Sequence, residues 1–95
     1  MEKGGYTYII TNHKNGTLYT GVTSDLIKRI AEHKSRRTPG FATRYGLNKL
    51  VWYETFPTIE GAIAQEKRIK EWNRSWKVEL IEKDNPNWLD LSDRF

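Results

Sequence analysis

The segment from Tyr6 to Thr23, YTYIITNHKNGTLYTGVT, decides the fold of this 95-residue chain. It contains two runs rich in β-forming residues, Tyr6–Thr11 and Thr17–Thr23, separated by the five residues NHKNG. β-branched and aromatic side chains favour strands, and the pair Asn15-Gly16 is typical of a tight turn. The segment is therefore predicted to form a β-hairpin.

A helix and a third strand are predicted after the hairpin. Ser24 is suited to cap a helix that runs to about Ser35, with Asp25 in its first turn. The apolar face of this helix consists of four residues, Leu26, Ile27, Ile30 and Ala31. The segment Asn48–Phe56 is rich in apolar and aromatic residues and is expected to form the third strand.

Two more helices are predicted in the last part of the chain. Thr58 is suited to cap a long helix, Ile59 to about Trp72, and either Asn73 or Ser75 begins a last helix that ends at Asn85-Pro86. The last helix is expected to bury three side chains, Trp76, Leu80 and Ile81. The order ββαβαα predicts an α+β domain in which helices flank a three-stranded, mostly antiparallel sheet.

Length and composition exclude several classes of protein. The chain is long enough for one domain, residues 1–95, with a motif-bearing core at residues 6–83 and an acidic tail at residues 84–95. The absence of cysteine excludes a disulfide scaffold and a cysteine-based zinc site, and two histidines do not make a histidine-rich metal cage. No apolar stretch is long enough to cross a membrane and no signal peptide is evident, so a cytoplasmic protein is expected.

Positive charge is concentrated in the middle of the chain. The net charge is +4, but the segment Lys28–Lys49 alone holds seven Lys and Arg residues against one carboxylate, Glu32. Such an excess favours a polyanionic partner, because each neutralised phosphate releases condensed counterions. The alternative is a solvated basic face with no partner. The candidate phosphate contacts in this segment are Lys34, Arg36, Arg37 and Arg44.

Two predicted helices carry ionisable residues next to their apolar faces. Arg29 and His33 are four residues apart, so they lie on one side of the first helix, at the edge of its apolar stripe. Glu66 falls inside the apolar arc of the long helix, where a carboxylate is costly to bury without a partner. An internal ion pair with Lys or Arg explains this position, and so does a Mg²⁺ site in a cleft, because Mg²⁺ prefers oxygen ligands.

The spacing of these residues resembles that of a known nuclease domain. The triplet Tyr6-Thr7-Tyr8 is followed after ten residues by Tyr19-Thr20-Gly21, with three polar residues downstream, Arg29, His33 and Glu66. This pattern resembles the GIY-YIG nuclease domain, over Tyr6 to about Leu91, and is most similar to its short, stand-alone bacterial members. The family triplets are Gly-Ile-Tyr and Tyr-Ile-Gly, so the chain keeps the last residue of the first triplet and both outer residues of the second.

The resemblance implies a metal-dependent endonuclease that hydrolyses phosphodiester bonds of DNA with Mg²⁺ or Mn²⁺. Glu66 matches the metal-binding glutamate, and Arg29 matches the arginine that stabilises the scissile phosphate. Tyr8 matches the tyrosine preferred as the base and Tyr19 the next candidate, while His33 matches a polar site residue. In this interpretation the flanking DNA backbone is bound, without recognition of the base sequence, by Lys34, Arg36, Arg37 and Arg44.

The resemblance also gives Gly21 a structural role, as the glycine that ends the second strand. Loss of the first family glycine, replaced by Tyr6, leaves open a binding module of the same fold with weak or absent catalysis. A small protein-interaction domain without a nucleic-acid role is a further alternative. The endonuclease hypothesis requires that the two phenols, Arg29 and Glu66 point into one solvent-open groove.

Overall fold

The computed structural model describes residues 4–35, 40 and 44–95. Its sheet has three strands, β1 (Gly5–Thr11), β2 (Leu18–Thr23) and β3 (Lys49–Phe56), in the order β2-β1-β3. Both pairs of neighbouring strands are antiparallel, so the predicted hairpin and sheet are confirmed. Because β1 lies in the centre, β2 forms one open edge of the sheet.

The turn between β1 and β2 requires the residues Asn15-Gly16. Asn15 has a φ of 62°, a left-handed conformation that Asn tolerates better than most residues. The Gly16 amide donates a hydrogen bond of 2.8 Å to the carbonyl of His13. A Cβ atom on Gly16 would overlap the side-chain oxygen of Asn12, so only glycine fits at this point.

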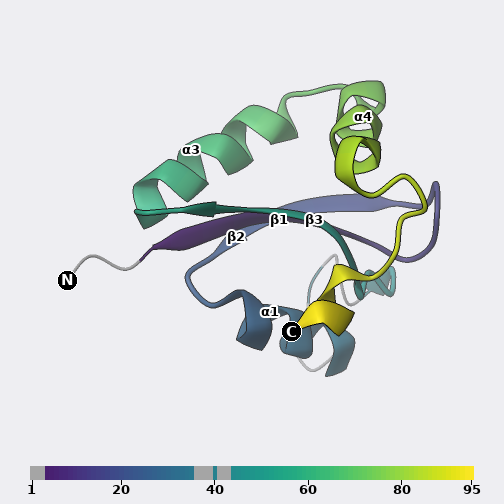
Figure 1. The fold of residues 1–95 in the computed structure, drawn as a ribbon, viewed down its shortest axis with the longest axis horizontal. Coiled ribbons are helices and arrows are strands. Elements are labelled where there is room, and N and C mark those ends of the chain that lie inside the picture. The colour runs from purple at the N-terminus through teal and green to yellow at the C-terminus, as the bar shows by residue number, and fades with distance from the viewer. Residues whose placement is uncertain (1–3, 36–39, 41–43) are drawn as a thin grey trace.

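The helices cover both faces of the sheet. In Figure 1, α1 (Leu26–Ser35) lies below the sheet, whereas α3 (Ile59–Lys70) and α4 (Arg74–Asp84) lie above it. A short 3-10 helix, η1 (Leu91–Arg94), follows near the C-terminus. The predicted order ββαβαα is confirmed. Among the described residues, no helix combines the length and the apolar character that a membrane span needs.

Polar side chains fix the starts of the helices. The Thr58 side chain accepts a hydrogen bond from the Gly61 amide at the start of α3, and Asn73 accepts one from the Trp76 amide at the start of α4. Both caps agree with the prediction. At α1, however, Asp25 rather than Ser24 takes this position, because its carboxylate accepts from the Lys28 amide at 3.1 Å.

The alternation of side chains along β1 divides the apolar core into two clusters. Tyr8 and Ile10 point to the α1 face, where they pack with Leu26, Ile30, Leu47, Leu50 and Leu91. Ile9 points to the opposite face and packs with Val51, Trp52, Ile69, Ile81 and Trp88. This division follows from the two-residue period of a strand. Tyr8 therefore lies on the same side of the sheet as α1.

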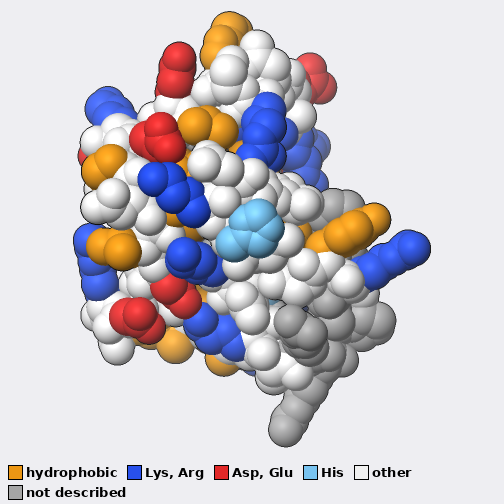
Figure 2. Space-filling model, turned by 90° about the vertical axis from the view of Figure 1, so that its right-hand side faces the viewer, with side chains coloured by type: hydrophobic (Ala, Val, Ile, Leu, Met, Phe, Trp, Pro, Cys, Tyr) orange, Lys and Arg blue, Asp and Glu red, His pale blue; other side chains and the backbone are white. Residues whose placement is uncertain are grey.

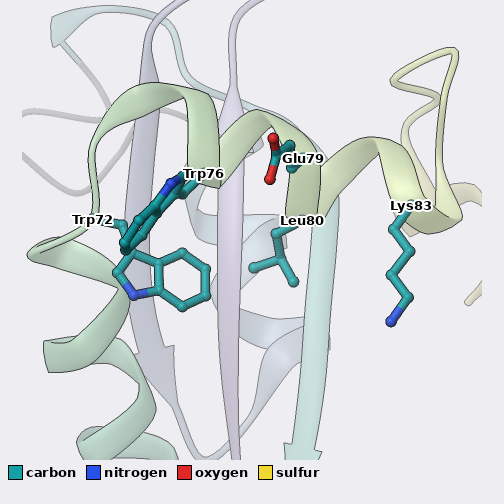
Figure 3. A pocket seen from close by; sticks show the side chains of 5 residues that line it. All are labelled: Trp72, Trp76, Glu79, Leu80 and Lys83. Atoms are coloured by element: carbon teal, nitrogen blue, oxygen red, sulfur yellow. The ribbon is translucent and has the colours of Figure 1, made fainter.

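Three residues predicted to face the core are exposed instead. On α1, Ile27 and Ala31 face solvent, because the buried stripe consists of Leu26, Ile30 and His33. On α4, Trp76 is 54% exposed and packs edge-on against Trp72, with ring centroids 6.1 Å apart. The two Trp rings and Leu80 line an apolar groove of about 420 Å³ (Figure 3).

The segment after α4 packs back onto the sheet. Trp88 and Leu91 are buried, one in each apolar cluster. The Asn85 side-chain amide donates hydrogen bonds to the carbonyls of Val51 and Leu89. The Asp90 carboxylate accepts one from the amide of Leu50. These contacts hold the C-terminal segment along β3, from Trp88 on the α4 face to Leu91 on the α1 face.

Candidate active site at the edge of β2

Tyr8 and Gly21 lie opposite each other on β1 and β2. A Cβ atom on Gly21 would overlap the Tyr8 hydroxyl group and lie 2.5 Å from Cζ of the same ring. The Tyr8 phenol therefore extends across Gly21 towards the edge of the sheet, in space that only glycine leaves open. Gly21 lies inside β2 and not at its end, which corrects the sequence prediction.

The Tyr8 hydroxyl group is held by two residues of α1. Its oxygen lies 3.0 Å from Nε2 of His33, in a buried hydrogen bond. The Arg29 guanidinium also forms a hydrogen bond with it. Because α1 has 3.6 residues per turn, Arg29 and His33 project from the same side of the helix towards the phenol. The prediction that both residues belong to one site on α1 agrees with this geometry.

Burial determines the charge state of this group of side chains. Desolvation raises the pKa of Tyr8, while the hydrogen bond and the positive charge of Arg29 offset part of that effect. Desolvation, and then the charge of Arg29, lower the pKa of His33 to about 4. Phenol and imidazole are therefore neutral at pH 7. Because Arg29 has only donors, the Tyr8 oxygen accepts from Arg29, whereas the direction of its hydrogen bond with Nε2 of His33 is set by the tautomer of the neutral ring.

Tyr19 brings a second phenol to the same face of the sheet. It lies on β2 opposite Ile10 and is half-buried against the α1 cluster. The centroid of its ring is 6.2 Å from that of His33, in an edge-on arrangement. Both phenol rings thus lie next to the His33 ring, which agrees with the prediction that the tyrosines of the hairpin share a site.

Glu66 approaches this group from α3. Its side chain is 14% exposed, and Oε2 lies 3.1 Å from Nζ of Lys70, one turn further along the helix. The Lys70 ammonium group in turn lies 5.9 Å from the centroid of the Tyr19 ring. The negative charge of Glu66 contributes to the raised pKa of Tyr8, so the carboxylate acts electrostatically on the phenol.

These side chains come together at the β2 edge of the sheet. Helices α1 and α3 lie on opposite faces (Figure 1), but α3 contacts both β1 and the edge strand β2. Lys70 at the end of α3 therefore reaches the Tyr19 ring past the edge of β2. The contacts form a continuous series, which runs from Arg29 through Tyr8, His33, Tyr19 and Lys70 to Glu66.

The four basic residues that are predicted to contact phosphate differ in their surroundings. Lys34 forms an ion pair with Asp90, with Nζ 2.6 Å from Oδ2, so its charge is partly neutralised within the chain. Arg44 is exposed and lies over the Tyr45 ring. Arg36 and Arg37 lie outside the described residues. Figure 2 shows the face at the hairpin turn, where Lys and Arg side chains are interspersed with Asp and Glu.

Lys70 is the residue of this site that the sequence prediction missed. The available signal was its position four residues after Glu66, a spacing at which acid and base meet on a helix. The sequence leaves two explanations for the position of Glu66, an internal ion pair and a metal site. The structure shows the ion pair, at a position that also borders the phenols.

The described part of the chain offers a divalent ion one carboxylate at this site, that of Glu66. Among the residues that the structure describes, no three His, Cys, Asp or Glu side chains are grouped closely enough to enclose a metal. Mg²⁺, however, commonly binds through one or two carboxylates and retains several waters. A single partly exposed carboxylate such as Glu66 is compatible with that type of binding.

Comparison with known proteins agrees with this geometry. Residues 4–79 match the sequence model of the GIY-YIG catalytic domain. The chain belongs to this family. Membership implies nuclease chemistry and nucleic-acid binding, and it confirms the resemblance predicted from the two triplets. The GIY-YIG match covers every strand of the sheet and all residues of the series from Arg29 to Glu66.

Two bacterial relatives have lengths similar to that of the chain. A UPF0213 protein of Bacillus pumilus is 34% identical over 82 residues, which cover 86% of this chain and 84% of the relative. A UPF0213 protein of Streptococcus pyogenes is 39% identical over 81 residues, with 83% and 86% covered. The solution NMR structure of UPF0213 protein BH0048 from Bacillus halodurans superimposes with a TM-score of 0.57, at 31% identity and 92% coverage of both chains.

Proposed function

We propose that this GIY-YIG protein is a metal-dependent endonuclease that hydrolyses phosphodiester bonds of DNA. The observation that carries the proposal is the series of contacts at the edge of β2. A guanidinium, two phenols and a neutral imidazole are held next to a carboxylate that approaches from another helix. Phosphodiester hydrolysis requires such a set, because a water must be positioned while negative charge develops on the phosphate.

Arg29 is assigned to the scissile phosphate. Its side chain is 30% exposed and Nη1 lies 3.5 Å from Oε1 of Glu32, but a guanidinium has five N–H donors, so it can bind a ligand in addition to Tyr8 and Glu32. Guanidinium groups bind two phosphate oxygens at once and remain charged at any physiological pH. At the rim of a buried cluster, this charge is less screened by water than on the surface. Arg29 therefore stabilises the non-bridging oxygens as they gain charge.

The two phenols are assigned different roles. The sequence favours Tyr8 as the base, but Tyr8 is 1% exposed and burial raises its pKa. Tyr8 is better suited to hold its proton on Oη and so to fix Arg29. Tyr19 is half-buried on the edge strand β2, and the centroid of its ring lies 6.2 Å from that of His33. We therefore assign the positioning of the attacking water to Tyr19.

Glu66 is assigned to the divalent ion. When bound, Mg²⁺ or Mn²⁺ supplies Lewis-acid stabilisation of charge on the leaving oxygen. The contribution of the chain is a carboxylate on a rigid helix, close enough to the phenols to act on them electrostatically. In the reaction, the water oxygen forms a bond to phosphorus, one P–O ester bond breaks, and a proton from the water ends on the released oxygen.

Cleavage of DNA by matched variants tests the proposal. The parent protein is incubated with Mg²⁺ and single-stranded, nicked and branched DNA, alongside Glu66→Gln and Arg29→Ala. Each variant should lose cleavage by a factor on the order of 10²–10³, since each removes one charge from the site. Lys28→Ala on α1 and Glu60→Gln on α3 remove charges from exposed positions outside the site and should cut like the parent.

Three results would contradict parts of the proposal. If Glu66→Gln and Arg29→Ala cut as well as the parent, the site assignment is wrong. If the parent binds DNA without products in any divalent ion, the chain is a binding module of this fold. If binding is absent, or insensitive to salt, the chain does not contact phosphates, because phosphate contacts weaken steeply as salt rises.

A further inference from the structure

Lys70 occupies a position between the two halves of the site. Its Nζ atom lies 3.1 Å from Oε2 of Glu66 and 5.9 Å from the centroid of the Tyr19 ring. The carboxylate is 14% exposed and the lysine 50% exposed, so the anion is more buried than its partner. A single ammonium group is thus shared between the proposed metal ligand and the phenol assigned to the attacking water.

The ion pair itself is weak enough to exchange. Pairs four residues apart on a helix, with one partner half-exposed, contribute only about 0.3–0.5 kcal/mol. Lysine is also a flexible point charge on four methylene groups, so its ammonium can leave the carboxylate without a backbone change. The helix that carries Glu66, in contrast, is fixed by the buried side chains of Ala62 and Ile69.

We propose that Lys70 is a positioning residue that competes with the divalent ion for the Glu66 carboxylate and couples metal binding to the Tyr19 ring. The inference rests on the proposed function, because it takes Glu66 as the metal ligand. Without the ion, Lys70 neutralises the partly buried carboxylate and keeps it directed to the edge of β2. When the ion binds, Lys70 gives up this contact and its position over the ring.

Competition has a measurable consequence for metal affinity. A fixed positive charge within several ångströms of a divalent ion opposes its binding, and removal of that charge should tighten binding by roughly three- to tenfold at low salt. The neighbouring Lys67 carries the same charge on the same helix but is exposed and not paired with Glu66. Lys67→Met therefore reports the effect of net charge alone.

Mn²⁺ binding, followed by electron paramagnetic resonance of the free ion, tests the inference without any measurement of cleavage. The variants compared with the parent are Lys70→Met, Lys70→Arg, Lys67→Met and Glu66→Gln. Lys70→Met should bind Mn²⁺ roughly three- to tenfold more tightly than the parent. Lys70→Arg and Lys67→Met should stay within about twofold of the parent, and Glu66→Gln should lose most of the affinity.

The outcomes separate the inference from the proposed function. If the parent binds Mn²⁺ through Glu66 but Lys70→Met and Lys67→Met have equal affinities, only the inference fails. If neither the parent nor Lys70→Met binds Mn²⁺, the metal site fails and the inference fails with it. If Lys70→Met binds Mn²⁺ and the parent does not, Lys70 excludes the ion from Glu66 completely, which supports the inference.

The Tyr19 ring gives a second readout, by nuclear magnetic resonance of the aromatic carbons and protons. Lys70→Met should shift the Tyr19 signals, because a charge next to the ring is removed, whereas Lys67→Met should leave them in place. Addition of Mg²⁺ to the parent should move the signals towards their positions in Lys70→Met. Tyr19 signals that ignore both the substitution and Mg²⁺ would overturn the coupling.

Discussion

The two halves of the candidate site are built in different ways. The α1 half consists of Tyr8, Arg29 and His33. Hydrogen bonds join them on the face of the sheet that α1 covers. The α3 half consists of Glu66 and Lys70, which are joined by one ion pair at the sheet edge. A buried network leaves its members few alternatives, whereas a half-exposed ion pair is easily replaced.

The contrast between the hydrogen-bonded network and the ion pair indicates which part of the site the fold fixes before any ligand binds. The proposed function assigns the phosphate to the α1 half, whose polar atoms would be costly to leave unpaired. The α3 half keeps an anion ready but neutralised by a mobile cation. We infer that phosphate binding relies on preorganised groups, while metal binding requires an exchange of partners. The substitutions below examine each half, from the largest expected effect to the smallest.

Gly21→Ala should damage the α1 half most. The new methyl group would overlap the Tyr8 phenol, which cannot move away without breaking its hydrogen bonds to Arg29 and His33. We expect DNA cleavage to fall by about two orders of magnitude, as when one transition-state donor is lost. Thermal unfolding should show a loss of about 1–3 kcal/mol from overpacking.

Gly61→Ala is the matched control for this substitution. A Cβ atom there meets nothing closer than 3.4 Å, and alanine is a better helix former than glycine. It should leave cleavage unchanged and raise stability by up to about 1 kcal/mol. Equal activity of the two alanine variants would show that the position of the Tyr8 hydroxyl group does not matter for the reaction.

Sequence reasoning reached the α1 half more completely than the α3 half. The hairpin, the spacing of Arg29 and His33, and the odd position of Glu66 follow from short-range patterns with periods of two or 3.6 residues. These patterns do not say where a helix lies relative to the edge of a sheet. The meeting point of the side chains at β2 therefore could not be predicted, because it depends on how α3 crosses β1 and β2.

The exposed position of Trp76 and the ion pair of Lys34 could not be predicted for a similar reason. Trp76 was assigned to the core because large aromatic residues are usually buried, but the core beneath α4 is already filled by Ile81 and Trp88. Lys34 was assigned to phosphate because it belongs to a basic segment. Its partner Asp90 lies 56 residues away in the sequence, and no local pattern indicates such a contact.

His33 should make the α1 half sensitive to acid. Burial lowers its pKa to about 4 in the folded protein, below the value near 6.5 expected for the unfolded chain. Between these values the unfolded state binds more protons, so stability is fully present above pH 6.5 and is lost as pH falls through 4. The expected loss attributable to His33 is about 3 kcal/mol, and denaturant unfolding at a series of pH values would measure it.

His33→Gln should remove this pH dependence between pH 4 and 6.5, whereas His13→Gln at the exposed hairpin turn should retain it. A parent protein with flat stability over that range would show that His33 is not held as a buried neutral ring.

Tyr8→Phe isolates the hydroxyl group from the ring. The phenyl ring still fits across Gly21, but Nε2 of His33 loses its partner in a buried position. Unfolding experiments should show a loss of about 1–2 kcal/mol, the cost of one unsatisfied buried polar atom. Tyr53→Phe, at a half-buried ring on β3, should change stability by less than about 0.5 kcal/mol. Similar losses for both variants would argue against the hydrogen-bonded network.

Lys34→Met should have the smallest effect, and the comparison with Arg44→Met decides which basic residues contact DNA. Lys34 is 41% exposed and paired with Asp90, so its removal should cost no more than about 1 kcal/mol of stability. A paired ammonium group contributes less to phosphate binding than an exposed guanidinium. Arg44→Met should therefore weaken DNA binding more and reduce the dependence of affinity on salt by about one phosphate contact. If Lys34→Met has the larger effect, DNA displaces Asp90, and the C-terminal segment competes with DNA for Lys34 as Lys70 is proposed to compete with the metal for Glu66.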